Sequence, residues 1–533
     1  MRTALEATAR DERLHGRPYH QRVRRLVFLV AAALVLAACG SSDDSSSAAT
    51  TGASTTAAPA TTPSSDTTAS PDTSAPAAGS LDWKACPDAG PRIECATLTV
   101  PIDYDNASGA TIDLALMRLP ASNKSERVGS MLVNPGGPGV PGTELIPAAT
   151  GIWPKDIRDR FDIVAWDPRG TGGSAPVDCV ADVDRYFAEP DPSPDTPAEK
   201  QELVDRAQEF DDACEKADGP MLAHISTVDT ANDLDRIRQA LGEDTITYFG
   251  FSYGSELGAT YATLFPKHIR AMVLDGAIDP DLDGVETAHA QAVGAEHALD
   301  SFLADCSAHR TCAFNNNGNA EGAFDALMAK LDSNPLPPPE KGRPQVGQGV
   351  ALNAVIQALY SRDLWPSLAE ALSAAQHGDG DGLLALRDSY LEREDDGTWS
   401  NTIEAFIAIS CLDDPVPRDI GSYDALADQF ANDAPRLGRS FAYGFQCALW
   451  PVPPRPGPKA TGAGAPPILV VGTTGDPFTP LAQSQQLADA LESGVLLVRE
   501  GEGHTAYGED KCIDDAVDAY ILDLTVPADG TRC

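Results

Sequence analysis

A serine between two glycines is the residue in this chain whose setting most favours covalent chemistry. Ser252 lies at the centre of residues 250–254 (GFSYG), after a β-branched and aromatic run and before apolar residues at helical spacing. In a G-x-S-x-G turn between a strand and a helix, the serine hydroxyl projects from the sheet, and the glycines leave out Cβ atoms that would collide. The motif predicts a nucleophile at Ser252, although the pentapeptide alone also fits an ordinary tight turn.

A serine hydroxyl needs a base within hydrogen-bond reach, and that base needs a carboxylate to fix its tautomer. His504 and Asp476 each follow a short apolar, strand-like run through a glycine-containing loop, downstream of Ser252. Parallel strands place their carboxyl ends at one edge of a sheet, so we expect the three side chains to converge there. We predict Ser252 as nucleophile, His504 as base and Asp476 as orienting acid, with Thr479 bonded to that acid. Asp275, which follows another strand, is the alternative acid.

Acyl transfer also requires hydrogen-bond donors for the developing oxyanion. One is expected from the N–H of Tyr253, at the start of the helix that follows the nucleophile. The other is expected from residues 135–139 (PGGPG), which follow the buried strand predicted at 130–134. Gly137 is our first choice and Gly136 the second, because glycine amides approach a substrate carbonyl without obstruction. A plain proline-rich turn is the alternative interpretation.

Strand-like and helix-like stretches alternate through much of the chain, which indicates an α/β fold with a mostly parallel sheet flanked by helices. Residues 81–279 are predicted to form the first part of this core, beginning with antiparallel edge strands. Residues 280–456 are helix-like and interrupted by proline-rich breaks, so we expect a mainly helical cap inserted between two strands. Residues 457–533 return to the strand–helix pattern and complete the core.

The first 80 residues are predicted to export the protein rather than to fold. Residues 1–39 combine several arginines with an apolar run too short for a membrane span, and end at Cys39 in a sequence that resembles a bacterial lipobox. By that resemblance Cys39 would be lipidated; an ordinary signal peptide is the alternative. Residues 40–80 are rich in Ser, Thr, Ala and Pro, which predicts a disordered tether. We expect a protein anchored by lipid to the outer face of the bacterial cytoplasmic membrane, or secreted.

The net charge and the positions of the cysteine and histidine residues limit the partners and cofactors that we expect. A net charge of −40 disfavours nucleic acid, and we expect a monomer that meets the membrane only through its anchor. No cysteine or histidine group has zinc-site spacing, so neither a metal nor another cofactor is predicted. The cysteines after Cys39 are even in number, as expected for disulfides in an exported chain. The simplest pairing joins sequence neighbours: Cys86 with Cys95, Cys179 with Cys214, Cys306 with Cys312, Cys411 with Cys447, and Cys512 with Cys533.

Together these motifs resemble those of a known family. Residues 134–139, 167–174, 250–254, 475–480 and 503–504 occur in the order seen in prolyl aminopeptidase-like α/β-hydrolases. More closely, residues 83–533 are similar to the secreted tripeptidyl aminopeptidases of actinobacteria, including their distinctive C-terminal region. The resemblance implies the α/β-hydrolase fold and the same roles for Ser252, Asp476 and His504. Prolyl aminopeptidases usually carry histidine where this chain has Pro135, so the resemblance does not extend to proline specificity.

Three functions follow from these features. The resemblance implies an aminopeptidase that releases short peptides from free N-termini, and Asp413 or Asp414 is then expected to pair with the substrate ammonium. A carboxylesterase or lipid-acting hydrolase with the same triad is the alternative, because a fold does not determine a substrate. A binding lipoprotein without catalysis is a remote third, because a complete Ser/Asp/His set in this order favours an enzyme.

Overall fold

The computed structural model describes residues 81–86, 88–338 and 340–533. The predicted leader, the lipid-acceptor Cys39 and the tether at 40–80 lie outside the described residues. Within the described part of the chain, no helix is both long and apolar enough to cross a membrane.

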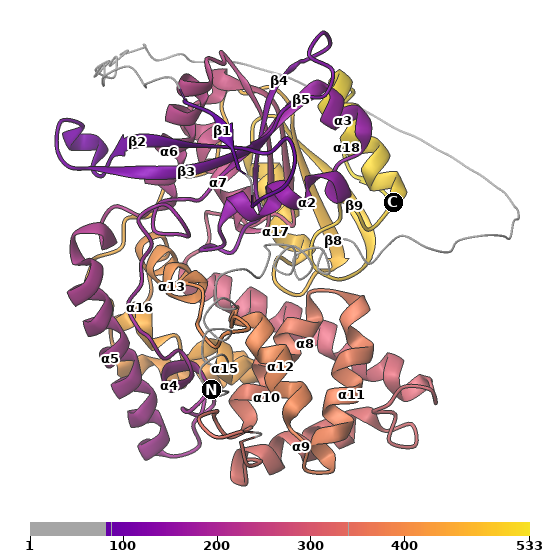
Figure 1. Ribbon diagram of the computed structural model, residues 1–533. Coiled ribbons are helices and arrows are strands. Elements are labelled where there is room, and N and C mark those ends of the chain that lie inside the picture. Colours follow the sequence, from indigo (N-terminus) through magenta and orange to yellow (C-terminus); the bar gives the residue numbers. More distant parts are fainter. Residues whose placement is uncertain (1–80, 87, 339) are drawn as a thin grey trace, which may run out of the picture.

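In the described residues a sheet of ten strands organises the fold, and it lies in the upper part of the molecule in Figure 1. The strand order is β1-β2-β3-β5-β4-β6-β7-β8-β9-β10. The strands are β1 (Lys84–Ala85), β2 (Glu94–Pro101), β3 (Thr111–Leu119), β4 (Gly129–Asn134), β5 (Phe161–Trp166), β6 (Ile246–Phe251), β7 (Ile269–Asp275), β8 (Ile468–Gly475), β9 (Gly494–Glu502) and β10 (Thr531–Arg532). The strands from β5 to β10 run parallel to one another, while β1, β2 and β3 add an antiparallel edge. The predicted α/β fold class is confirmed.

Burial explains why the parallel and the antiparallel strands of the sheet have different patterns of apolar and polar residues. Every residue of β4 and β5 is buried, as a parallel strand covered on both faces requires. In β3 the first residues alternate between exposed and buried, as in an antiparallel strand with one face in water. The continuous apolar runs therefore mark the centre of the sheet, where the carboxyl ends of β6, β8 and β9 meet.

Helices cover both faces of the sheet. On one face Leu132 and Val470 pack with the apolar sides of α6 (Thr227–Leu241), α7 (Tyr253–Leu264) and α17 (Leu481–Ala490). On the other face Met131 and Leu469 pack with α2 (Leu145–Ile152), α3 (Lys155–Arg160) and α18 (Lys511–Asp523). Neighbouring residues of one strand thus enter opposite cores, as the period of two predicts.

The helical cap lies between β7 and β8 in sequence and forms the lower part of the molecule in Figure 1. Its helices are α8 (Gly284–Ala308), α9 (Ala320–Ser333), α10 (Gln348–Leu359), α11 (Trp365–Gln376), α12 (Asp381–Tyr390), α13 (Thr402–Asp413), α14 (Tyr423–Asp433), α15 (Gly438–Ala442) and α16 (Phe445–Leu449). A separate apolar core, built largely from α8 to α12, holds it together.

Two helices that precede the nucleophile in sequence also join the cap. They are α4 (Asp184–Phe187) and α5 (Pro197–Leu222), which the sequence pattern assigned to the first core part. Phe210 and Cys214 of α5 share an apolar cluster with Ile409 and Leu412 of α13. Figure 1 shows α5 running beside α16, away from the sheet. The surface of the cap therefore draws on two separate stretches of the chain.

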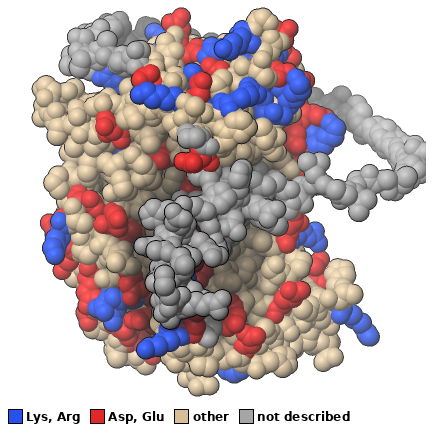
Figure 2. All heavy atoms as spheres, viewed as in Figure 1, with Lys and Arg blue, Asp and Glu red and all other residues tan. Residues whose placement is uncertain are grey.

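Five disulfides join the ten described cysteines in the pairs expected from sequence proximity. The Cys179–Cys214 bond ties the loop after β5 to α5, and the Cys411–Cys447 bond ties α13 to α16. The first bond therefore links a cap helix to a loop of the core, and the second links two helices within the cap. Figure 2 shows acidic side chains spread over much of the visible face, with basic ones gathered mainly at its upper end.

Candidate active site

Ser252 occupies the turn between β6 and α7, with a left-handed backbone φ of 53°. A non-glycine residue in this region is strained, and such strain concentrates at functional sites. The turn is too tight for larger neighbours, because a Cβ on Gly250 would lie 2.1 Å from the Gly254 carbonyl oxygen. The Ser252 N–H donates a 2.8 Å hydrogen bond to the carbonyl of Asp275, which anchors the turn to the end of β7. The local sequence thus produces the expected nucleophile turn.

His504 and Asp476 form a close pair in the loops after β9 and β8. The Nδ1 atom of His504 lies 2.9 Å from Oδ1 and 3.0 Å from Oδ2 of Asp476. The Asp476 carboxylate also accepts the backbone N–H groups of Phe478, Thr479 and Thr505. Thr479 bonds to Asp476 through its backbone N–H, as noted, and its hydroxyl oxygen lies 3.3 Å from His504 Nδ1. Thr479 therefore contacts the histidine as well as the predicted acid.

Electrostatics favour the charge states that a triad uses. Burial alone would disfavour both charged forms, but each partner's charge and the hydrogen bonds between them outweigh it. The pKa of Asp476 is therefore held below its ordinary value, and the pKa of His504 is raised. Asp476 remains a carboxylate, and the imidazolium of His504 is stabilised once it forms.

The second ring nitrogen of His504 remains available for catalysis. Its Nε2 atom is buried and has no hydrogen-bond partner within the described residues. No hydrogen bond joins it to Ser252 Oγ, but both residues line one cavity of about 260 Å³. In hydrolases such hydrogen bonds are often long without substrate and shorten in the complex. The structure thus brings the three predicted residues to one rim of the sheet.

The glycine loop after β4 lies directly against the nucleophile turn. A Cβ on Gly136 would lie 2.6 Å from the Phe251 carbonyl oxygen and 2.8 Å from Ser252 Cβ. The Gly136 N–H already donates to the side-chain oxygen of Asn134, at 2.9 Å. Among the turns, loops and caps of the described chain, neither the Gly137 nor the Tyr253 N–H donates a hydrogen bond. Gly137 and Tyr253 are therefore better placed than Gly136 to receive an oxyanion.

The cap contributes directly to the position of His504. The His504 N–H donates a 2.9 Å hydrogen bond to the carbonyl of Tyr360, the residue after α10. The Tyr360 ring packs edge-on against the imidazole, with 5.4 Å between ring centres, and against Phe478. Sequence reasoning missed Tyr360, because its approach to the histidine depends on how the cap folds back.

The same cavity is mostly apolar but holds two acids, Glu392 and Glu509. Glu392 follows α12, and its Oε2 accepts hydrogen bonds from Ser400 Oγ at 2.7 Å and Thr402 Oγ1 at 2.5 Å. Its backbone φ is 54°, another strained position. Glu509 lies 3.8 Å from Arg499, and burial raises the pKa of Glu509. Sequence reasoning missed both glutamates, because acidic residues are frequent in this chain and neither follows a core strand directly.

Asp413 and Asp414, predicted to bind a substrate amine, do not line this cavity. They line a different one of about 190 Å³, together with Glu256 of α7. The Asp413 carboxylate is buried and accepts hydrogen bonds from the N–H and the hydroxyl of Thr227. Burial and the nearby Asp283 raise the pKa of Asp414 to about 7. Asp413 thus joins the end of α13 to the start of α6, and neither acid lines the cavity that contains Ser252.

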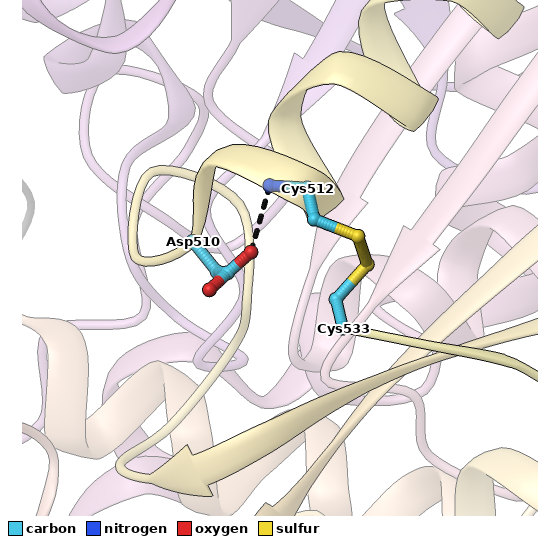
Figure 3. A group of neighbouring side chains, drawn as sticks. All are labelled: Asp510, Cys512 and Cys533. Carbon is cyan, nitrogen blue, oxygen red and sulfur yellow. Dashed lines mark hydrogen bonds between the residues drawn. A yellow bond between two sulfur atoms is a disulfide. The ribbon is translucent and has the colours of Figure 1, made fainter. Parts of the chain in front are cut away.

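A cluster of possible metal ligands elsewhere has a structural explanation. Asp510, Cys512 and Cys533 bring ligand-type atoms within 4.8 Å of one another (Figure 3). The two sulfur atoms are joined in a disulfide, and Asp510 caps α18 by accepting the N–H of Cys512 at 2.7 Å. A disulfide sulfur is not the thiolate that metals require, so this group is a helix cap beside a cross-link.

Comparison with known proteins agrees with this geometry. A family model described as "TAP-like protein" matches residues 434–533. Serine protease Hip1 of Mycobacterium tuberculosis is 37% identical over 488 residues, covering 85% of this chain and 91% of the relative. Carboxylesterase B of the same organism is 36% identical, covering 82% and 86%. The tripeptidyl aminopeptidase of Streptomyces coelicolor is 31% identical, covering 86% of each chain. This chain therefore belongs to the family of α/β-fold serine hydrolases that contains Hip1 and the tripeptidyl aminopeptidases.

Proposed function

We propose that this protein is a serine aminopeptidase in which Ser252, His504 and Asp476 form the catalytic triad. The observation that carries the proposal is the His504–Asp476 pair. Nε2 of His504 has no hydrogen-bond partner within the described residues, and His504 lines the cavity that Ser252 also lines. The relatives named as a serine protease and a tripeptidyl aminopeptidase support peptides as the substrate class.

In the proposed mechanism, Ser252 Oγ attacks the carbonyl carbon of the scissile bond while His504 Nε2 accepts the hydroxyl proton. The oxyanion receives hydrogen bonds from the Tyr253 and Gly137 amides, a contribution of about 3 kcal/mol for each donor. The tetrahedral intermediate then expels the amine, which takes the proton from His504. Water, deprotonated by His504, attacks the acyl-enzyme, and His504 gives that proton to Ser252 Oγ as the acid product leaves. Asp476 stays ionised throughout.

We further propose that Glu392 and Glu509, rather than Asp413 and Asp414, pair with the ammonium of the substrate N-terminus. The support is location, because these two are the acids of the cavity that contains Ser252. Ser400 and Thr402 both donate to Oε2 of Glu392, which leaves Oε1 to accept an ammonium hydrogen. A charge-assisted hydrogen bond of this kind is about twice as strong as a neutral one.

The test compares peptide p-nitroanilides with free and acetylated N-termini. We expect Glu392→Gln and Glu509→Gln to raise KM for the free peptides about tenfold and to leave the acetylated ones unchanged, since one charge-assisted contact contributes about 1.5 kcal/mol. The control is Glu370→Gln, because Glu370 is an exposed acid of α11 in the same cap. Equal cleavage of free and blocked peptides by the wild type would exclude the aminopeptidase assignment.

A carboxylesterase is the second candidate. The cavity favours it through its apolar lining, which includes Leu145, Ile152 and Phe406, and the relative named Carboxylesterase B supports it. Short p-nitrophenyl esters measured beside the peptides distinguish the two. In either case a fluorophosphonate probe should label the wild type and not Ser252→Ala, whereas a non-catalytic binding protein would remain unlabelled.

We also propose export with lipidation at Cys39 and a monomeric state. We propose the division into a core of residues 81–279 and 457–533 around a cap of residues 280–456, against which α4 and α5 of the first core part pack. The sequence of the leader and the five disulfides support an oxidising compartment. Labelling with a fatty-acid analogue should mark the wild type and not Cys39→Ala. Sedimentation of residues 81–533 should give the mass of one chain.

A further inference from the structure

Asp275 contacts the chain segments of both proposed catalytic groups. It is the last residue of β7 and its side chain is fully buried. Its backbone carbonyl accepts the N–H of Ser252 at 2.8 Å. Its carboxylate accepts the N–H groups of Ala506 at 3.0 Å and Tyr507 at 2.8 Å, in the loop that carries His504. One residue therefore connects the nucleophile turn to the histidine loop.

The histidine loop depends on such an anchor. Gly503 and Thr505 have left-handed φ values of 108° and 70°, so the loop bends sharply on both sides of His504. After that bend three successive amides point at carboxylates, because Thr505 donates to Asp476 while Ala506 and Tyr507 donate to Asp275. Without Asp275, two buried N–H groups would lose their acceptors, which destabilises this conformation of the loop.

Asp275 is also close enough to influence the imidazole by its charge. The chain beside it packs on the ring, since a Cβ on Gly276 would lie 3.3 Å from His504 Cε1. The titratable groups that act on Asp275 are His504 and Asp476, while Tyr360 packs on the histidine from the cap. Burial raises the pKa of Asp275 to about 6, so the group is mostly ionised at neutral pH. The Asp275 charge adds to that of Asp476 in raising the pKa of His504.

We propose that Asp275 is a positioning residue that fixes His504 relative to Ser252 and adds a second negative charge behind the imidazole. The inference rests on the proposed triad and goes beyond it. Asp275 does not take the role of orienting acid, because His504 Nδ1 bonds to Asp476. Asp275 acts through the loop backbone and through its field, without touching substrate.

The test uses Asp275→Asn and Asp275→Ala in the full-length protein, with the ester or peptide that the wild type cleaves best. Misplacing a catalytic group by about 1 Å costs about 100-fold in rate, so we expect Asp275→Ala to lower kcat about 100-fold with little change in KM. Asp275→Asn keeps one acceptor oxygen and should lose about tenfold. In Asp275→Asn the acidic limb of kcat/KM should also move to lower pH, because the imidazolium loses a nearby anion.

The matched control is Asp162→Asn. Asp162 is a buried aspartate at the opposite end of the sheet that also accepts a backbone amide, that of Ala121. The Asp162→Asn substitution should leave kcat and the acidic limb of the kcat/KM profile unchanged. An Asp275→Asn variant that melts cooperatively, yet keeps the wild-type kcat and the wild-type acidic limb of kcat/KM, would overturn the proposal. A variant that does not fold would also overturn it, because Asp275 would then be needed for folding rather than for positioning His504. Wild-type protein without fluorophosphonate labelling at Ser252 would instead refute the proposed function.

Discussion

The Nδ1 atom of His504 lies almost equally far from the two carboxylate oxygens of Asp476, at 2.9 and 3.0 Å. This contact requires the proton on Nδ1 and leaves Nε2 as the base. Asp476→Asn would present an amide that can stabilise the opposite tautomer. We expect kcat/KM to fall about 10⁴-fold, as judged with the best ester or peptide substrate. A loss of less than tenfold would show that Asp476 is not the orienting acid.

The pH dependence of activity should report the titration of His504. Burial lowers its pKa, but the charge of Asp476, the hydrogen bond to Asp476 and the charge of Asp275 together raise it above the ordinary value of 6.5. The base must be neutral to accept the Ser252 proton, so kcat/KM should fall as pH drops through a pKa above 6.5. A rate that stays flat from neutral to mildly acidic pH would contradict this role.

Gly136→Ala should abolish most activity while leaving the fold intact. The added Cβ would lie 2.6 Å from the Phe251 carbonyl, at a glycine with a φ of 99°. The loop must shift away from Ser252, which should cost about 100-fold in kcat/KM. Gly151→Ala is the control, because a Cβ on this residue of α2 meets nothing within 4 Å. It should leave activity unchanged and stabilise the protein by about 0.5–1 kcal/mol.

Asp211 of α5 should make stability fall as pH rises. Its carboxylate is fully buried, and neither oxygen has a hydrogen-bond partner within the described residues. Burial raises the pKa of Asp211 to about 8, so the folded protein holds a proton that the unfolded chain releases near the ordinary value of 3.8. The stability that this protonated group contributes is complete below that value and is lost as pH rises through about 8.

Asp211→Asn removes this titration. We expect it to raise the free energy of unfolding by about 1–3 kcal/mol more at pH 9 than at pH 5, measured by urea denaturation. Asp205→Asn, a change at an exposed acid of the same helix that does not act on Asp211, is the control and should show no such difference between the two pH values. An equal effect of Asp211→Asn at both pH values would mean that the carboxylate is hydrated rather than buried.

The sequence by itself determined the core of this protein because its signals are local. The turn at Ser252 is specified by glycines that the adjacent backbone needs, and the loops of Asp476 and His504 follow buried strands whose parallel arrangement sends their ends to one edge. Those patterns predicted the sheet, the three candidate catalytic residues and the oxyanion loop from chain order alone.

Only the tertiary structure decided what surrounds these residues. Tyr360 and Glu392 come from the cap, more than 100 residues from either Ser252 or His504, and no periodicity predicts which cap residues face the cavity. Asp413 and Asp414 are the acids that the sequence suggested for the substrate amine, yet they line another cavity. Asp275, weighed from sequence as an alternative acid, became an anchor of the histidine loop. Side chains that meet through packing of separate helices carry no local signature, because their proximity depends on the whole fold.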